Sequence, residues 1–367
     1  MAVKFLDLRK QYLSLKSEID QAIAEVFDSS AFVSGKHVSQ FEDEFAKYQR
    51  IENCIGCGNG TDAIEIALEA LDLPPNSEII VPANTFIATS EAVTRTGHRV
   101  VFCDCDPDTY TIGEKQIRAK LTANTRAVIV VHLYGQPCDM NGVMKVALER
   151  NLKVIEDCAQ AHGADIAGRR VGSIGALGTF SFYPGKNLGA AVDAGASVTN
   201  DRQLARKVRM IANHGRTGKY DHEFEGRNSR LDGLQAAILS VKLRHLDEWI
   251  GRRREIASHY YGHLSNLDAL KLPGRTNWGG HVFHLFVVRT KRREELREFL
   301  AGQGIETGIH YPIALPKLKA YAYIPPPSDE MCANQIDSEL LSLPIGDHMT
   351  VDDAVEVSSA CRRFFGK

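Results

Sequence analysis

The sequence lacks three features that would place it in large classes of protein. No apolar run approaches the roughly 20 residues that a bilayer-spanning helix needs. The formal net charge of -2 gives no global field that favours nucleic acid or an anionic membrane. Met1 to Lys10 alternates charged and apolar residues and has no signal-peptide core. We therefore expect a cytoplasmic protein that binds neither membranes nor nucleic acid.

Eight cysteines raise the question of a metal or redox site. Cys54 and Cys57 form a C-x-x-C pair, a spacing used for both purposes in intracellular proteins. No histidine pair with zinc-site spacing lies near Cys54, and Cys103 and Cys105 stand two residues apart in a strand-like run. We favour reduced cysteines that pack as small hydrophobic residues without a metal, and keep a metal or redox site as the alternative.

Short apolar, β-branched runs alternate with helical patterns over much of the chain. Runs that are apolar on both faces and separated by helices predict an α/β fold, with a mainly parallel sheet covered by helices on both sides. Ligands of such sheets bind beyond the carboxyl ends of the strands. The expected strands are Ile79–Val81, Val100–Phe102, Ala127–Val131, Val154–Ile155, Thr179–Phe182 and Ala196–Val198, and expected helices include Phe86–Arg95 and Met140–Arg150.

A long helical pattern starts near residue 231. Apolar residues three or four apart form one face of this helix: Leu231, Leu234, Ile238 and Val241. A loop and a new strand-like run, Phe283–Val288, follow. We place a domain boundary near Gly251, which divides the chain into a large domain, residues 1–250, and a smaller C-terminal α+β domain, residues 251–367. The Pro325-Pro326-Pro327 run predicts a short rigid turn or polyproline segment.

An acidic pair, Glu156 and Asp157, directly follows the expected strand Val154–Ile155. A carboxylate at the end of a strand can keep a proton on a heterocyclic nitrogen, as an aspartate does for the pyridinium nitrogen of pyridoxal phosphate. A helix N-cap explains the same residue about as well. Asp157 is therefore a candidate cofactor partner, with helix capping as the alternative.

A lysine occupies the loop after another expected strand, in the segment Ser181-Phe182-Tyr183-Pro184-Gly185-Lys186-Asn187. The neighbouring glycine and proline restrict the backbone around Lys186. A neutral lysine amine can form a Schiff base, and partial desolvation lowers its pKa toward that role. Ser181, on the strand itself, can donate to a phosphate. A loop lysine taken alone is more often surface charge, so its meaning depends on the other segments.

A glycine-containing turn, Gly58-Asn59-Gly60-Thr61-Asp62-Ala63, precedes the helix-like run Ile64–Leu71. Glycines that lead into a helix expose backbone N–H groups, and these groups suit a phosphate. Asp62 is expected to be the helix N-cap, because its carboxylate would repel a phosphate.

Together these segments resemble the DegT/DnrJ/EryC1/StrS sugar aminotransferases. This family belongs to the aspartate-aminotransferase group of pyridoxal-phosphate enzymes, which share fold type I. The resemblance covers nearly the whole chain and rests first on Gly60-Thr61-Asp62, Asp157 with Gln160, and Ser181 with Lys186. It also includes the segments Val81 to Thr89, His132 to Pro137, Asn213 to Gly215, Asn228 to Leu231 and His310 to Pro312.

The resemblance implies roles around the cofactor, pyridoxal 5'-phosphate. Lys186 would hold it through a Schiff base and then carry the proton between substrate and cofactor. Asp157 would pair with the ring nitrogen, Gln160 would lie near the ring hydroxyl, and Phe86 would stack on the ring face. Gly60, Thr61 and Ser181 would hold the phosphate where the helix begins, and Asp62 would lie beside them in the cofactor-binding site.

Further roles concern the substrate and the assembly. His310 and Tyr311 would line the substrate side together with Tyr183, although ordinary loop packing remains the alternative for the first two. Asn228 would reach into the neighbouring subunit's site. The resemblance therefore implies a homodimer with shared active sites.

Two positions depart from the family pattern. Val192 stands where a glycine is usual, and a valine there would be strained if the backbone φ is positive. Gly233 stands where an acidic residue is usual, and within a helix it would cost about 1 kcal/mol relative to alanine.

The resemblance favours an aminotransferase that moves an amino group from glutamate to a nucleotide-linked keto-sugar. A sugar dehydratase on the same scaffold is an alternative, but dehydratases that resemble this family replace the lysine with histidine, which Lys186 contradicts. A non-catalytic regulator is a further alternative, although no DNA-binding helix-turn-helix with a basic face is fused to the chain.

Val81 to Thr89, followed by Phe102 to Pro107, resembles family members that act at C-3 of dTDP-3-keto-6-deoxyhexoses. Members that use UDP-sugars or aminate C-4 share most of these motifs. The C-3 reaction on a dTDP-sugar is therefore the preferred hypothesis, and the other two sugars remain alternatives.

Overall fold

The apolar runs of the sequence assemble into a seven-stranded sheet in the order β1-β9-β8-β5-β4-β2-β3. The computed structural model describes residues 2–325 and 330–366, so most of the predicted Pro325–Pro327 turn lies outside the described residues. The neighbours β2/β3, β2/β4, β4/β5 and β5/β8 are parallel, whereas β9 is antiparallel to β1 and β8. The strands are β1 (Asn53–Cys57), β2 (Glu78–Pro82), β3 (Arg99–Cys103), β4 (Thr125–Val131), β5 (Lys153–Asp157), β8 (Leu177–Ser181) and β9 (Gly195–Thr199).

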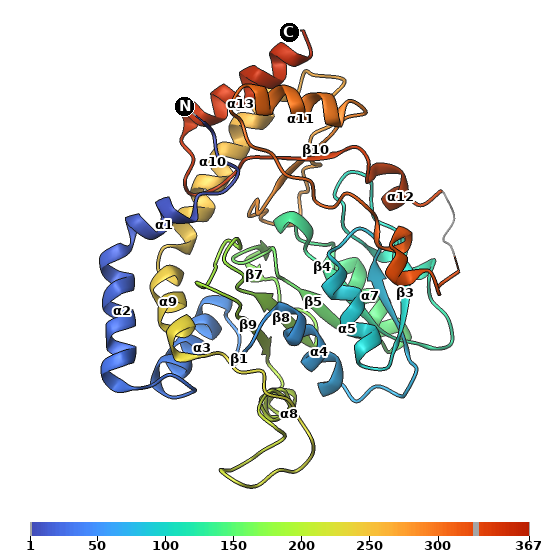
Figure 1. Ribbon diagram of the computed structural model, residues 1–367. Coiled ribbons are helices and arrows are strands. Elements are labelled where there is room, and N and C mark those ends of the chain that lie inside the picture. The colour runs from blue at the N-terminus through green and yellow to red at the C-terminus, as the bar shows by residue number, and fades with distance from the viewer. Residues whose placement is uncertain (1, 326–329, 367) are drawn as a thin grey trace.

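Helices cover both faces of this sheet (Figure 1). One face packs against α3 (Lys36–Gln49), α7 (Met140–Arg150) and α9 (Gly233–Leu243). The other packs against α4 (Gly60–Ala70), α5 (Ile87–Arg95) and α8 (Arg202–Ala212). The mainly parallel, helix-covered sheet predicted from the sequence is confirmed.

The remaining elements lie around this core. The helices are α1 (Leu8–Ser14), α2 (Lys16–Ser29), α6 (Glu114–Arg118), α10 (Leu246–Leu264), α11 (Arg293–Gly302), α12 (Cys332–Ile336) and α13 (Val351–Phe364). Two small antiparallel pairs join β6 (Asp165–Ile166) to β7 (Arg169–Arg170) and β10 (Phe286–Arg289) to β11 (Leu340–Leu343). Within the described residues, no helix combines the length and the apolar character needed to cross a membrane.

A separate hydrophobic cluster forms the C-terminal end of the molecule, where α10, α11 and α13 lie together above the sheet in Figure 1. Residues from Ile256 to Cys361 supply this cluster, and Val3 from the other end of the chain joins it. The chain runs through Gly251 inside α10 without a break, because this helix spans Leu246–Leu264. We therefore propose that α10 connects a large domain, residues 1–250, to a small one, residues 251–367.

The strands predicted in the large sheet agree with the observed ones to within about two residues at each end, whereas Phe283–Val288 agrees only in part and β1, β6, β7 and β11 were not predicted. Of the run Phe283–Val288, only the part from Phe286 onward pairs in a strand. The strand β1 was missed, because its sequence, Asn53 to Cys57, reads more readily as a C-x-x-C motif. Its antiparallel pairing with β9 joins segments that are far apart in the sequence.

The cysteines of the two closely spaced pairs separate across the sheet. Cys54 and Cys103 lie in the hydrophobic cluster on one face, and Cys57 and Cys105 lie in the cluster on the other. All eight cysteines are free thiols, and all but Cys332 are buried. Cys103 is the last residue of β3 and Cys105 lies beyond the strand, so the alternation of strand side chains does not decide which face Cys105 meets.

Both departures from the family pattern have a structural account. Val192 does not adopt a positive φ, so the strain considered for it is not present. Gly233 is the first residue of α9, where Asp232 is the N-cap. A Cβ on Gly233 would lie 2.0 Å from the carbonyl oxygen of Ala31. The expectation that alanine would be preferred at this position is therefore wrong.

This close approach predicts opposite effects for two glycine substitutions. Gly233→Ala should lower the free energy of unfolding by about 1–3 kcal/mol, because the Ala31 backbone must move. Gly251→Ala is the matched control: no atom lies within 4 Å of its Cβ position, and alanine should stabilise α10 by up to about 1 kcal/mol. Urea denaturation of both variants measures the difference, and equal stabilities would contradict the clash.

Candidate active site

The carboxyl ends of the central strands open into one cavity of about 830 Å³. Its walls come from the loops after β5 and β8, from the first turns of α4 and α5, and from the C-terminal part of the chain near residues 310 and 345. Eleven candidates predicted from the sequence line it: Gly60, Thr61, Asp62, Phe86, Asp157, Gln160, Ser181, Tyr183, Lys186, His310 and Tyr311. Asn228 does not.

Lys186 lies in a tight loop that directly follows β8. Its backbone N–H donates to the Tyr183 carbonyl at 2.8 Å, and Ala190 N–H closes the loop onto the Phe182 carbonyl at 2.7 Å. Burial lowers the pKa of Lys186 to about 8, while the negative charge of Asp157 acts in the opposite direction. A substantial share of this lysine is therefore a neutral amine near physiological pH, which a nucleophile requires.

Asp157 is the last residue of β5 and is 4% exposed. Its carboxylate accepts hydrogen bonds from Ala159 N–H at 3.1 Å and from the Thr89 hydroxyl at 2.9 Å. Burial raises the pKa of Asp157, and these two hydrogen bonds together with the charge of Lys186 act against that rise. Residues 158–163 form turns rather than a helix, so the alternative role as a helix N-cap is wrong.

Thr89 was not singled out from the sequence, although it closes the segment Val81 to Thr89 on which the resemblance partly rests. It follows Phe86, the N-cap of α5, by three residues, so one helical turn brings both side chains to the same cavity. This spacing was the available signal.

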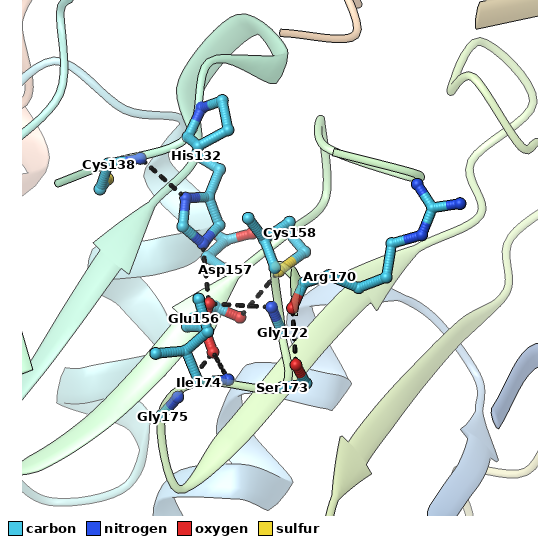
Figure 2. A network of polar contacts seen from close by, with 12 residues as sticks. His132, Cys138, Glu156, Asp157, Cys158, Arg170, Gly172, Ser173, Ile174 and Gly175 are labelled. Carbon is cyan, nitrogen blue, oxygen red and sulfur yellow. Dashed lines mark hydrogen bonds and ion pairs between the residues drawn. The ribbon is translucent and has the colours of Figure 1, made fainter. Parts of the chain in front are cut away.

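A buried carboxylate next to Asp157 fixes the end of β5 (Figure 2). Glu156 accepts backbone N–H bonds from Gly172, Ile174 and Gly175 at 2.8, 2.7 and 2.7 Å. The Cys138 N–H donates to His132 Nδ1 at 3.0 Å, so the ring proton lies on Nε2, 3.1 Å from Glu156. Burial raises the pKa of Glu156, but the hydrogen bonds from His132 and the loop amides outweigh it and keep that pKa low.

The start of α4 forms a cradle that fits a phosphate. Gly60 and Thr61 are the first two helical residues, so no carbonyl within the helix accepts from their N–H groups. A Cβ on Gly60 would lie 2.5 Å from Ser181 Cβ, so only glycine allows the helix to approach Ser181 this closely. The geometry therefore fits the phosphate of pyridoxal phosphate between Gly60, Thr61 and Ser181.

The predicted N-cap of α4 is wrong. Asn59 is the cap, and its side chain accepts from Asp62 N–H at 2.9 Å. Asn59 has the extended backbone that a cap needs, whereas Asp62 is already helical. The Asp62 carboxylate instead accepts from the Ser229 hydroxyl at 2.6 Å, and this contact ties α4 to the segment that contains Asn228.

Aromatic and amide side chains form another part of the cavity wall. Phe86 and Tyr311 lie with ring centroids 5.7 Å apart. Gln160 accepts from the Tyr134 backbone N–H at 2.6 Å and donates to the Tyr311 hydroxyl at 3.0 Å. Burial, with a contribution from Lys186, lowers the pKa of His310 to about 4, so this ring is neutral near physiological pH. The wall therefore offers uncharged polar groups beside two aromatic rings.

Two groups of side chains have metal-ligand chemistry within the described residues: Asp104, Cys105 and Cys332, and His132, Glu156 and Cys158. Backbone N–H groups already occupy the carboxylates of both Asp104 and Glu156. Neither group includes Cys54 or Cys57. The geometry therefore favours carboxylates that accept backbone hydrogen bonds over carboxylates that bind a metal ion.

Comparison with known proteins identifies the family. A model of the DegT/DnrJ/EryC1/StrS aminotransferase family matches residues 13–362. The chain belongs to this family. The whole-chain resemblance expected from the sequence is therefore confirmed.

Individual members agree along the full length. The chain is 47% identical over 362 residues to the dTDP-3-amino-3,6-dideoxy-alpha-D-galactopyranose transaminase of Aneurinibacillus thermoaerophilus, covering 99% of each chain. It is 43% identical to the dTDP-3-amino-3,4,6-trideoxy-alpha-D-glucose transaminase of Streptomyces venezuelae, covering 99% of this chain and 96% of that one. The crystal structure of S. venezuelae DesV in complex with a ketimine intermediate matches with a TM-score of 0.97 at 42% identity, covering 100% and 99% of the two chains.

Proposed function

We propose that the protein is a pyridoxal-phosphate aminotransferase that moves an amino group from glutamate to C-3 of a dTDP-linked 3-keto-6-deoxyhexose. One observation carries this proposal. The Lys186 amine, whose pKa burial lowers to about 8, and the buried Asp157 carboxylate open into the same cavity as the phosphate cradle. An amine nucleophile, a partner for a ring nitrogen and an anion site are the three contacts that this cofactor requires.

The residues of the cavity divide these contacts among them. Gly60, Thr61 and Ser181 would hold the phosphate, and Phe86 would lie on one face of the ring. Asp157 would keep the ring nitrogen protonated, which makes the bound cofactor an electron sink for the carbon that loses a proton. Gln160 would lie near the ring hydroxyl, oriented by its bonds to Tyr134 and Tyr311.

Lys186 would move the proton. Its pKa of about 8 lies near working pH, so the amine can accept a proton in one step and return it in the next. Thr89 and Ala159 hold the Asp157 carboxylate in place by donating to its two oxygens. The wall formed by Tyr183, His310 and Tyr311 would contact the sugar and exclude water from the reacting atoms.

The substrate follows from the relatives rather than from a contact in the cavity. Two relatives that are 43% and 47% identical carry names of transaminases forming 3-amino sugars on dTDP. All eight cysteines are free thiols, which suits action in the reducing cytoplasm.

Incubation with glutamate and a panel of nucleotide-linked keto-sugars, read by mass spectrometry, tests the function. Conversion of the dTDP-3-keto-6-deoxyhexose to its amino sugar, with loss of conversion in Lys186→Ala, is the expected result. Preferred conversion of a UDP-linked or 4-keto sugar would correct the substrate while keeping the reaction. Release of water without amine transfer would indicate a dehydratase and contradict the proposal.

We also propose that each site is shared between two chains. Asn228 is exposed and does not line the cavity of its own chain, although Ser229 beside it bonds to Asp62 at that cavity. In a two-fold homodimer, contacts across the interface are reciprocal, so both sites would form together. Asn228 would donate to the cofactor phosphate in the partner's site.

Mixing two inactive variants tests the sharing. Lys186→Ala removes the amine, and Asn228→Asp places a carboxylate where it would repel the phosphate. In the mixed dimer one site receives both defects and the other receives neither, so activity should return after subunit exchange. A mixture that stays inactive, with exchange shown by mass, would assign Asn228 to its own chain's site.

A further inference from the structure

His284 lines the active-site cavity but has no role in the function proposed above. It lies in a segment whose backbone is fixed from two sides. Val282 N–H donates to the Gly135 carbonyl at 3.0 Å, and Leu285 N–H donates to the Tyr134 carbonyl at 3.2 Å. On the other side, Nη1 of the buried Arg253 donates to the His284 carbonyl at 3.2 Å. The ring therefore starts from a rigid backbone.

The hydrogen bonds of Asn187 fix the tautomer of this ring. Asn187 is buried directly after Lys186, and its Nδ2 donates to the Val282 carbonyl at 3.3 Å. A carbonyl can only accept, so the amide is oriented with Oδ1 toward His284, 3.1 Å from Nδ1. The His284 proton must lie on Nδ1. Nε2 then carries a lone pair and can only accept while the ring is neutral.

The surroundings keep the ring neutral. Burial, followed by the positive charges of Lys186 and Arg253, holds the pKa of His284 well below its usual value. Within the described residues, no hydrogen bond to Nε2 is present, and His284 as a whole is only partly buried. The free side of the ring therefore presents a fixed acceptor to the cavity that also contains Lys186.

We propose that His284 is a substrate-specificity residue whose Nε2 accepts a hydrogen bond from a hydroxyl of the keto-sugar. This inference rests on the proposed function and deepens it. The amino donor fits this position poorly, because the nitrogen of glutamate must react at the cofactor, and its carboxylates have no proton to donate at neutral pH and would face the lone pair of Nε2. A sugar offers O–H donors. These donors match Nε2, an acceptor whose orientation is fixed before the sugar binds.

Equilibrium binding separates this contact from turnover. In a Lys186→Ala background, which does not turn over, calorimetry would measure the dissociation constant of a dTDP-linked 3-amino-3,6-dideoxyhexose. Adding His284→Leu should raise that constant about tenfold, because a ligand hydroxyl is left without a partner. Adding His284→Gln, whose amide oxygen can accept, should restore most of the affinity. Conversion of the cofactor by glutamate should be unchanged by His284→Leu in the Lys186-containing protein.

A neighbouring histidine supplies the matched control. His281 precedes His284 by three residues, stacks on Phe283 with ring centroids 3.8 Å apart, and does not line the active-site cavity. His281→Leu should leave the affinity for the dTDP-sugar unchanged. Thermal unfolding of each variant shows whether the fold is kept.

The outcomes are separable. Equal affinity of the His284→Leu protein and its parent for the dTDP-sugar would overturn the inference. The inference would also be overturned if His284→Leu slowed the glutamate reaction by the same factor by which it weakens binding of the sugar. Failure of the glutamine variant to bind better than the leucine variant would assign His284 to packing and overturn the inference as well. If the parent itself does not bind the dTDP-sugar, the proposed substrate is wrong and the inference falls with it.

Discussion

The parallel pairing of β5 with β8 is the constraint on which the site depends. Its register places Asp157 opposite Thr179, two residues before Ser181 at the end of the neighbouring strand. Both strands therefore deliver their polar ends to the same edge of the sheet. The short loop after Ser181 returns Lys186 to that edge, and the start of α4 meets it there because Gly60 has no side chain. Sheet register, rather than any single contact, brings together an amine, a carboxylate and an anion site.

Burying these groups requires that the polar atoms around them have partners. Glu156 is fully buried, and its two carboxylate oxygens accept from three backbone N–H groups and from His132. Hydrogen bonds to charged groups contribute about 1.5–3 kcal/mol each, and removing a partner would leave a desolvated charge. This network lies directly behind Asp157, so the backbone that carries the Asp157 carboxylate is fixed. For Lys186, in contrast, burial lowers the pKa more than the negative charge of Asp157 raises it.

Asp157, Ser181 and Lys186 lie at or just after strand ends, and local strand and loop patterns in the sequence are enough to predict their positions. The same local patterns favour Asp62 as the α4 cap, although Asn59 has the extended backbone that a cap needs. Contacts made over long sequence distances leave no such pattern. His284 pairs with Asn187 across 97 residues, and the requirement for Gly233 comes from the carbonyl of Ala31. Such partners are set by tertiary packing and leave no local pattern.

The rate at which the apoprotein attaches pyridoxal phosphate, measured against pH, tests the central claim most directly. Borohydride would trap the attached cofactor at each pH, and peptide mapping would locate it. Because burial lowers the pKa of Lys186 to about 8, the neutral amine accumulates as pH rises through that value. The account predicts label on the Lys186 peptide and a rate that rises up to about pH 8 and then levels. Label on another lysine, or a rate that still climbs toward the ordinary lysine pKa of about 10.4, would contradict it.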